Sequence, residues 1–428
     1  MKHVLQLRLK KLWPLLFVAI FSISAISVDR LKSHVTWLSD PLREGRRAGS
    51  SGANSSAEYI AGRLKEAGYS IQMQDLVGNR RNVIGRFGDA AKYIVIGAHY
   101  DGQGTGFLSA SDNAAGVAVL LELARELKDE KLPVSVVAVA FDDEEQGLNG
   151  SRYYVDHSPF PLENAVAALV MDTLGRSFMD NSAWTLFVLG TEYSKELAGV
   201  VQKRSRTEML VAGTDLIGPR SDFAPFAVKK VPYLFFSNAT HKDYHGSGDT
   251  PDRLEYTRLA QDAAVISQIA KDIARLTTKP QFLQDPIYPP TEADALERQF
   301  AVIEKERKDV GEAYRLMFAD LRSRIRTDKS REAPQIAATA LLAFATPRLS
   351  SYMLSFILGP FYESQGKREI AIAVYDEAIK WSEGDSKVEL EKKVRGLRSG
   401  PNGLALLKPF SDSTMPQRSL TAHINDPE

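Results

Sequence analysis

The stretch KYIVIGAHYD, from Lys92 to Asp101, is a continuous apolar run that ends in polar residues. A run without polar alternation is typical of a strand buried on both faces, as in a sheet covered by helices. Ligands of such open α/β sheets bind beyond the carboxyl ends of the strands, where His99 and Asp101 stand. The stretch therefore predicts both a fold class and the edge of the sheet that carries the chemistry.

The sequence around this stretch alternates between strand and helix patterns from Arg46 to Thr277. Apolar strand patterns occupy residues 82–88, 133–142, 165–173, 184–190 and 231–237, and helical patterns occupy residues 54–69, 112–130 and 257–276. Alternation of this kind favours parallel strands, because parallel neighbours need a crossover connection. We therefore predict an α/β fold in which helices sandwich a mixed, mostly parallel sheet.

Length and composition narrow the possible functions. The chain has 428 residues, which is too long for one compact core and predicts two domains. Lys plus Arg number 54 and equal Asp plus Glu, so the charge balance does not favour binding to nucleic acid. The chain contains no cysteine, which excludes disulfides and thiolate ligands. Any metal must therefore be held by histidine and carboxylate side chains.

The two ends of the chain differ in character from the α/β segment. Basic residues precede an apolar run from Trp13 to Val28, the pattern of a signal peptide or an N-terminal membrane anchor over residues 1–28. We therefore expect an exported protein, periplasmic or secreted, either free or tethered to the membrane. The α/β domain would cover residues 29–278, a Pro-rich linker residues 279–292, and a disordered polar tail residues 399–428.

From residue 293 to residue 398 the sequence predicts an all-α domain. A charged helical pattern runs without interruption to residue 326, and further helical patterns follow. One pair, over residues 352–385, is similar to a single tetratricopeptide unit, in which Gly359, Ala371 and Ala378 are small enough to let two helices approach closely. An unrelated helical hairpin explains the pair almost as well. Such helices could recruit a protein partner, restrict access to the first domain, or mediate self-association.

Five loops of the α/β segment carry histidine or carboxylate side chains. Each residue alone has an ordinary explanation, since Asp112 could cap a helix and Asp172 could be a solvated acid at a strand end. The residues are His99, Asp112, the run DDEE at 142–145, Asp172 and His245. We expect the loops to converge at one edge of the sheet. Imidazole and carboxylate ligands suit zinc, and a paired site also needs one carboxylate that bridges two ions.

The motifs GAHYD, SDNAAG, DDEEQGLNGS, MDTLG and YHGSGDT resemble those of the co-catalytic zinc aminopeptidases of clan MH, the family of bacterial leucyl aminopeptidase and aminopeptidase Y. The resemblance covers residues 46–276, and it is specific because five motifs occur in the family's order and spacing. It implies the zinc-exopeptidase fold for this segment. It also implies two zinc ions per chain and hydrolysis of N-terminal residues from peptide substrates.

Carried over residue by residue, the resemblance implies a ligand set for both ions. One zinc would be held by His99 and Asp172, and the other by Glu145 and His245. Asp112 would bridge the two ions, and its place at the start of a helix leaves its carboxylate pointing at them.

The resemblance gives supporting roles to other acids. Glu144 would be the general base, which takes a proton from water and passes it to the leaving amine. Successive side chains of a strand diverge, so at a bend after the strand Glu145 can bind metal while Glu144 faces the water. Asp101 would orient the imidazole of His99, and Asp249 would support the loop that carries the second histidine. The other two acids of the run, at 142 and 143, would add only a negative field.

The sequence also departs from the family pattern. Phe223 stands where the family commonly has a histidine, which affects local substrate contacts rather than metal binding. An aromatic hydroxyl that assists the tetrahedral intermediate in some relatives has no clear equivalent, and Tyr244, Tyr233 and Arg220 are the candidates. His241 lies four residues before a proposed ligand, but no glutamate follows it and the surrounding Gly, Asp and Ser predict a loop, so the H-E-x-x-H pattern fails.

Three other functions are compatible with the sequence. Glutaminyl cyclase resembles the same family and keeps much of the ligand set, and it would differ by a single zinc and by activity on Gln-initiated peptides. A carboxypeptidase-like enzyme is the second alternative. The third is a non-enzymatic scaffold or receptor-like binding protein, which would have lost metal ligands that are all present here.

Overall fold

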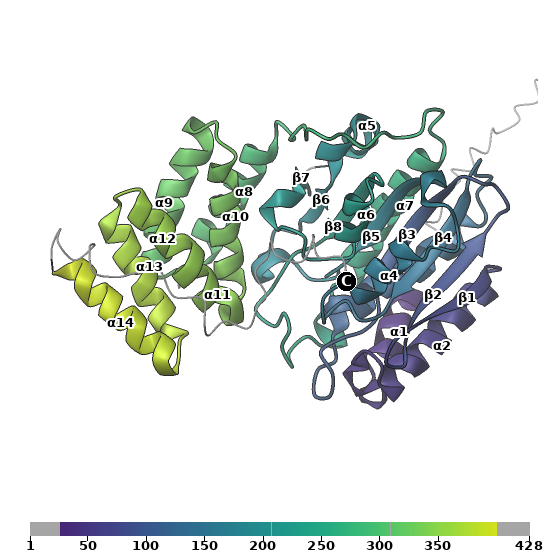
Figure 1. Ribbon diagram of the computed structural model, residues 1–428, viewed down its shortest axis with the longest axis horizontal. Coiled ribbons are helices and arrows are strands. Elements are labelled where there is room, and N and C mark those ends of the chain that lie inside the picture. The colour runs from purple at the N-terminus through teal and green to yellow at the C-terminus, as the bar shows by residue number, and fades with distance from the viewer. Residues whose placement is uncertain (1–25, 207, 309, 400–428) are drawn as a thin grey trace, which may run out of the picture.

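The structure is a computed structural model that describes residues 26–206, 208–308 and 310–399, and an α/β part and a helical part lie side by side in it (Figure 1). The strands are β1 (Ser70–Leu76), β2 (Arg80–Phe87), β3 (Tyr93–His99), β4 (Ser135–Phe141), β5 (Ala165–Met171), β6 (Leu186–Leu189), β7 (Met209–Ala212) and β8 (Tyr233–Ser237). The helices of the α/β part are α1 (Val28–Leu38), α2 (Ser51–Glu66), α3 (Ala115–Leu127), α4 (Asn149–Asp156), α5 (Lys195–Arg204), α6 (Phe223–Val228) and α7 (Tyr256–Ala274). Those of the helical part are α8 (Glu292–Glu306), α9 (Glu312–Thr327), α10 (Glu332–Ala345), α11 (Pro347–Met353), α12 (Gly359–Ser364), α13 (Arg368–Lys380) and α14 (Gly384–Arg398).

Within the described residues, the strands form one sheet in the order β1-β2-β4-β3-β5-β8-β6-β7. β4, β3, β5 and β8 run parallel, whereas β2 pairs antiparallel with β4 and β6 pairs antiparallel with β8. β3, which contains most of the stretch KYIVIGAHYD, thus lies at the centre between β4 and β5. The prediction of a mixed sheet with a parallel centre, followed by helices, is confirmed.

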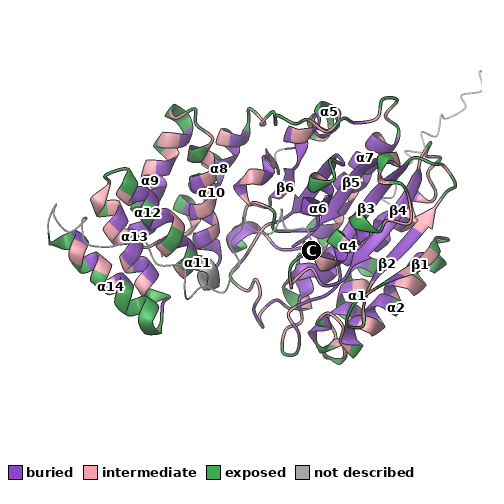
Figure 2. Ribbon diagram, in the orientation of Figure 1, coloured by how far each residue is buried: buried purple, intermediate pink, exposed green. Residues whose placement is uncertain are grey.

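Two hydrophobic cores cover the two faces of the sheet. Along β3, Tyr93 and Val95 pack into one core, whereas Ile94 and Ile96 pack into the other. Helices α1, α2, α3 and α7 contribute to the second core, and α4, α6 and the helical part contribute to the first. Every residue of β3, β4 and β5 is buried, as the central strands of Figure 2 show. This double burial explains why those strands are uniformly apolar.

The sequence patterns do not predict β1 and β7. β1 lies at one edge of the sheet and most of its residues are exposed or half-buried, so its sequence is largely polar. β7 lies at the other edge and has only four residues. Short or solvated edge strands gain their order from pairing with a neighbour, and local sequence carries little of that information.

The prediction of one continuous helix from residue 293 to residue 326 is wrong. The first helix, α8, ends at Glu306, and the next helix, α9, runs back along it. The reversal brings the ring of Phe300 within 5.0 Å of the ring of Phe318, and Arg322 Nε donates a 2.9 Å hydrogen bond to Glu297. A single long helix would leave these apolar faces in water, so burying them against each other favours the hairpin.

The helices of residues 352–385 pack as closely as their small residues predict. A short π-helical turn, Leu354–Leu358, joins α11 to α12, and α13 packs against this segment. A Cβ atom on Gly359 would lie 2.3 Å from the ring of Tyr375, so only glycine permits the approach. The similarity to a tetratricopeptide unit stays a prediction.

The expectations for the chain ends fall mostly outside the described residues. This holds for residues 1–25 of the predicted signal peptide or anchor and for residues 400–428 of the predicted tail. None of the helices within the described ranges combines the length and the apolar character that crossing a membrane requires. Export therefore stays a prediction.

Arg46 ties the N-terminal segment to loops beside the carboxyl edge of the sheet. Its guanidinium is fully buried and donates hydrogen bonds of 2.7–3.0 Å to the backbone carbonyls of Tyr100, Leu38, Leu108 and Ser109. Each carbonyl left without a donor costs about 1–3 kcal/mol. We expect Arg46→Met to lower the free energy of unfolding by more than about 3 kcal/mol, as measured by urea denaturation followed by circular dichroism.

The neighbouring Arg47 provides the control, because it is exposed. Arg47→Met should change the free energy of unfolding by less than about 0.5 kcal/mol. Equal losses in the two variants would contradict the role given to Arg46.

Candidate metal centre

The side chains predicted to bind metal gather beyond the carboxyl ends of the central strands. They are His99 at the end of β3, Glu145 after β4, Asp172 after β5, Asp112 in the turn before α3, and His245 in the loop after β8, and Glu144, the predicted general base, lies with them. Within the described residues they fall into two groups, each with one potential ligand atom from three side chains lying within 4.8 Å of one another. The parallel centre of the sheet therefore brings the predicted loops together.

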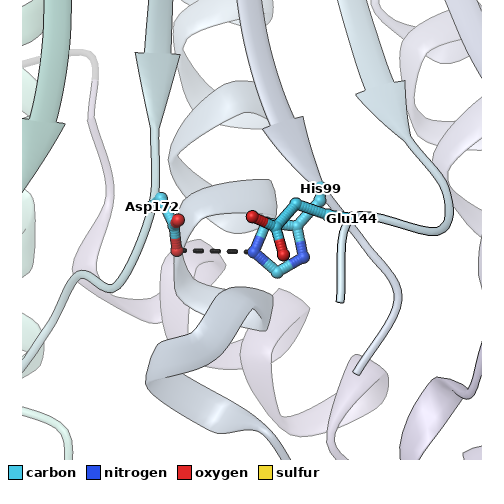
Figure 3. Close-up of side chains that lie close together, drawn as sticks. All are labelled: His99, Glu144 and Asp172. Carbon is cyan, nitrogen blue, oxygen red and sulfur yellow. Dashed lines mark hydrogen bonds and ion pairs between the residues drawn. The ribbon is translucent and has the colours of Figure 1, made fainter. Parts of the chain in front are cut away.

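The first group consists of His99, Glu144 and Asp172 (Figure 3). The Nε2 atom of His99 lies 3.4 Å from Asp172 Oδ1, and the imidazole is buried. The carboxylate of Glu144 lies beside this pair. Glu144, the residue expected to be the general base, thus lies close to both side chains that the resemblance expects to hold one ion.

The second group consists of Asp112, Glu145 and His245. The Nε2 atom of His245 lies 3.0 Å from Asp112 Oδ2 and 3.3 Å from Glu145 Oε2. The other oxygen of Asp112, Oδ1, lies 3.3 Å from the Nε2 atom of His99. Each oxygen of Asp112 therefore faces one imidazole, which is the arrangement a bridging carboxylate needs.

The electrostatics of the two groups favour divalent cations. Four carboxylates share the site with two imidazoles, and carboxylates so close together cannot all ionise without added positive charge. Burial and the carboxylate of Asp112 raise the pKa of Glu145 to about 8, and burial raises the pKa of Glu144 well above its ordinary value. Glu145 Oε1 is buried and accepts no hydrogen bond from the described residues. This donor set of imidazoles and open carboxylate oxygens fits zinc.

Asp101 supports both groups. Its Oδ1 lies 3.4 Å from the Nδ1 atom of His99, where the resemblance expects an orienting partner. Its two oxygens also accept hydrogen bonds from the backbone N–H groups of Glu144, at 3.1 Å, and Glu145, at 3.2 Å. One buried carboxylate therefore lies against the imidazole of His99 and holds the bend that separates Glu144 from Glu145. The sequence does not reveal this second role.

Asp249 lies on the His245 loop, but its carboxylate binds the loop of Asp112. It accepts hydrogen bonds from the backbone N–H groups of Ser111, at 3.0 Å, and Asp112, at 3.1 Å. The hydroxyl of Ser111 also donates to it and lies 2.8 Å from the Nε2 atom of His241. Sequence reasoning set His241 aside, yet it is buried in the network that positions the bridging carboxylate.

The first two acids of the DDEE run have partners of their own. Asp142 accepts a 3.0 Å hydrogen bond from the backbone N–H of Arg81. Asp143 pairs with Arg80 at 2.9 Å and accepts a 2.8 Å hydrogen bond from Asn149. The structure therefore gives both acids local structural contacts, and neither belongs to a metal-binding group.

Of the residues considered for contact with the intermediate, Tyr244 lies at the site. Its ring stacks on that of His245, with centroids 4.0 Å apart, and burial raises its pKa well above the ordinary value. The hydroxyl of Tyr233 lies 2.9 Å from Thr214 Oγ1 instead, and Arg220 is exposed.

Two further residues show how the late segment of the α/β part is used. Ser221, which sequence reasoning missed, donates a 2.7 Å hydrogen bond to Asp172 Oδ2. Phe223, which replaces the histidine common in the family, is buried and stacks on Tyr233 with centroids 5.3 Å apart. The side chain of Phe223 therefore packs in the hydrophobic core and belongs to neither metal-binding group.

This sheet, with two linked imidazole–carboxylate groups beyond its central strands, defines the chain as a zinc-dependent metallopeptidase with the exopeptidase architecture. Residues 82–270 match the profile of Peptidase family M28. The matched residues lie within the α/β part, which is therefore similar to this family. The zinc aminopeptidase resemblance seen in the motifs is confirmed at the level of the family.

Several known proteins are similar to this chain in sequence or in fold. Aminopeptidase YwaD of Bacillus subtilis (strain 168) is 27% identical over 202 residues, which cover 45% of this chain and 43% of that protein. Uncharacterized protein YfbL of Escherichia coli (strain K12) is 26% identical over 283 residues, 55% of this chain and 85% of that protein. The structure of the LapA aminopeptidase of Legionella pneumophila shares the fold, with a TM-score of 0.52, 20% identity, and coverage of 59% of this chain and 71% of that one. The chain thus spans less than half of YwaD.

Proposed function

We propose that this chain is an aminopeptidase that removes N-terminal residues from peptides with two zinc ions. The position of Asp112 carries the proposal, because its two oxygens face His99 and His245 and can join two ions. His99 and Asp172 would hold one ion, and Glu145 and His245 the other. The free amine of the substrate would lie beside the second group, whose carboxylates favour a positive charge.

Zinc, Glu144 and Tyr244 would have different roles in peptide hydrolysis. When bound, zinc supplies Lewis acidity, which polarises the scissile carbonyl and makes water more acidic. Glu144, whose backbone is held by Asp101, accepts the proton of the attacking water and passes it to the leaving amine. Burial raises the pKa of Glu144, which suits a group that must hold this proton between two steps. The hydroxyl of Tyr244 stays protonated and can donate a hydrogen bond to the developing oxyanion.

The other functions compatible with the sequence are less favoured. A single-zinc glutaminyl cyclase would not need a carboxylate that faces two imidazoles. A binding scaffold would not need two complete ligand groups or a buried base beside them. YwaD and LapA are both named as aminopeptidases, which favours action at the N-terminus over a carboxypeptidase.

Metal analysis combined with a substrate scan tests the proposal on the full chain. We expect about two zinc ions per chain and hydrolysis of aminoacyl-p-nitroanilides, with little activity on N-blocked peptides. One zinc per chain and cyclisation of Gln-initiated peptides would replace the proposal with the cyclase. Release of C-terminal residues would favour a carboxypeptidase, and a zinc-free, inactive chain would favour a scaffold.

A further inference from the structure

A cavity of about 120 Å³ lies beside the first metal-binding group. Asp172, a member of that group, and Tyr244 both line it, so the cavity is continuous with the candidate site. Apolar side chains from three strands of the sheet provide much of its surface, among them Phe187, Leu210 and Phe235. The cavity is therefore a place where an apolar group of a substrate can leave water next to the reacting atoms.

The helical part supplies one wall of this cavity. Leu296 on α8 and three residues on α10, Ala338, Leu341 and Leu342, line it together with the residues of the sheet. Leu296, Ala338 and Leu341 are buried. Figure 1 shows α8 and α10 as the helices of the helical part that lie next to β6 and β7, and α8 contacts β7 directly. Side chains of the helical part therefore line the same cavity as Asp172.

Polar contacts hold the helical wall against the α/β domain. Asp215 accepts hydrogen bonds from Arg331, with Nε at 2.5 Å, and from Gln335, at 2.9 Å, at the start of α10. Glu292, at the start of α8, accepts a 2.6 Å hydrogen bond from the backbone N–H of Gly213. Charge-assisted contacts at the first turns of both helices fix their position relative to the sheet. These hydrogen bonds therefore hold α8 and α10 in a defined position at the cavity.

We propose that the helical domain, through the wall that α8 and α10 supply, sets the size of the N-terminal side chain that this cavity accepts. The proposal rests on the aminopeptidase function proposed above. A cavity of about 150 Å³ holds a benzene-sized guest, so about 120 Å³ suits a somewhat smaller group such as one branched aliphatic side chain. Among the described lining residues only Asp172 and Arg220 are charged, and a charged substrate side chain would lose hydration in this lining.

Filling the cavity from the helical side tests the proposal. In Ala338→Phe the new ring should occupy space that a substrate side chain needs. We expect kcat/KM for Leu- and Phe-p-nitroanilide to fall at least 10-fold relative to Ala-p-nitroanilide, with the zinc content unchanged. Because a phenylalanine there could disturb folding, thermal unfolding is measured on the same preparation.

Enlarging the cavity gives a second, independent variant. Leu341→Ala should raise the kcat/KM ratio of Phe- to Ala-p-nitroanilide by roughly 3-fold or more, because the larger ring gains room. Leu321→Ala on α9 is the matched control: Leu321 is fully buried in the helical part but does not line the cavity, so this variant should lose stability and keep the wild-type ratio.

The outcomes separate this inference from the function on which it rests. A wild-type chain that hydrolyses no aminoacyl substrate defeats the proposed function itself. An active wild type whose substrate ranking is the same in Leu341→Ala and in Leu321→Ala overturns the role of the helical wall alone. A change of ranking in the control as large as in Leu341→Ala would also overturn it, because the effect would then come from general loosening of the helices.

Discussion

Replacing Glu144 with glutamine should lower kcat by about 10²–10⁴-fold while the chain keeps its zinc. The carboxylate lies beside His99 and Asp172, and the resemblance assigns the first ion to those two residues and the proton transfer to Glu144. Glutamine preserves the shape and the backbone hydrogen bond to Asp101, and it removes only the site that accepts a proton. The rate of Leu-p-nitroanilide hydrolysis and the zinc content of the same sample measure the two effects.

Asp142 offers a matched control within the same acid run. Burial raises the pKa of Asp142 to about 7, so an asparagine there differs little from the partly protonated acid. Asp142→Asn should keep kcat within about 3-fold of wild type, since its oxygens contact backbone N–H groups of Arg81 and Asp143 and not the metal-binding groups. Full activity in Glu144→Gln would show that another group takes the proton.

A loss of zinc in Glu144→Gln would have a different meaning. Glu144 would then act as a third ligand in the first group, which its distance from His99 and Asp172 permits. The turnover of that variant would no longer report on proton transfer, and the assignment of the base would fail with it.

Much of the α/β domain could be predicted from the sequence because its strands are buried on both faces. A strand such as β3, buried along its whole length, must be apolar throughout and must end where polar residues begin. His99, Asp172 and the DDEE run stand at such ends, so strand ends and the rule for ligand position in open sheets locate them together. Each of these inferences uses only local sequence and the direction of the strands.

The parts that the sequence does not reveal depend on contacts between distant segments. His241 belongs to the site because it contacts Ser111, which lies 130 positions earlier in the sequence. No local sequence pattern shows that two residues so far apart are in contact. The second role of Asp101, as the acceptor for two backbone N–H groups after β4, depends in the same way on the pairing of β3 with β4. The turn between α8 and α9 is a similar case, because the helical pattern continues through it and only the packing of Phe300 on Phe318 requires the break.

The role of the helical domain also depends on contacts that the sequence does not reveal. Sequence reasoning leaves three uses open for these helices, namely a partner site, restricted access or self-association. The cavity beside Asp172 favours the second, because side chains of α8 and α10 lie within the site and limit its size. A domain that forms a wall of the pocket must also stay docked during turnover, and the contacts of Asp215 with Arg331 and Gln335 are placed to hold it.

Replacing Asp112 with asparagine should remove activity and reduce the zinc content below two per chain. In Asp112 each oxygen faces an imidazole, whereas asparagine offers one oxygen and one N–H₂ group that repels a cation. We expect kcat to fall at least about 10³-fold, because asparagine can serve only one of the two ions and no longer joins them. Inductively coupled plasma mass spectrometry on the full chain measures the zinc, and thermal unfolding with and without a chelator measures its contribution to stability.

The stability readout distinguishes loss of metal from loss of fold. An ion that binds only the folded chain adds about 4 kcal/mol at a free concentration 1,000 times its dissociation constant, so a chelator should lower the melting temperature of wild type more than that of Asp112→Asn. Asp262→Asn is the control, since Asp262 is also buried but accepts hydrogen bonds from Trp184 and Asn238 away from the metal-binding groups. Its zinc content and its response to the chelator should match those of wild type. If Asp112→Asn binds two zinc ions with wild-type affinity, another carboxylate bridges the ions and the central assignment of the site is wrong.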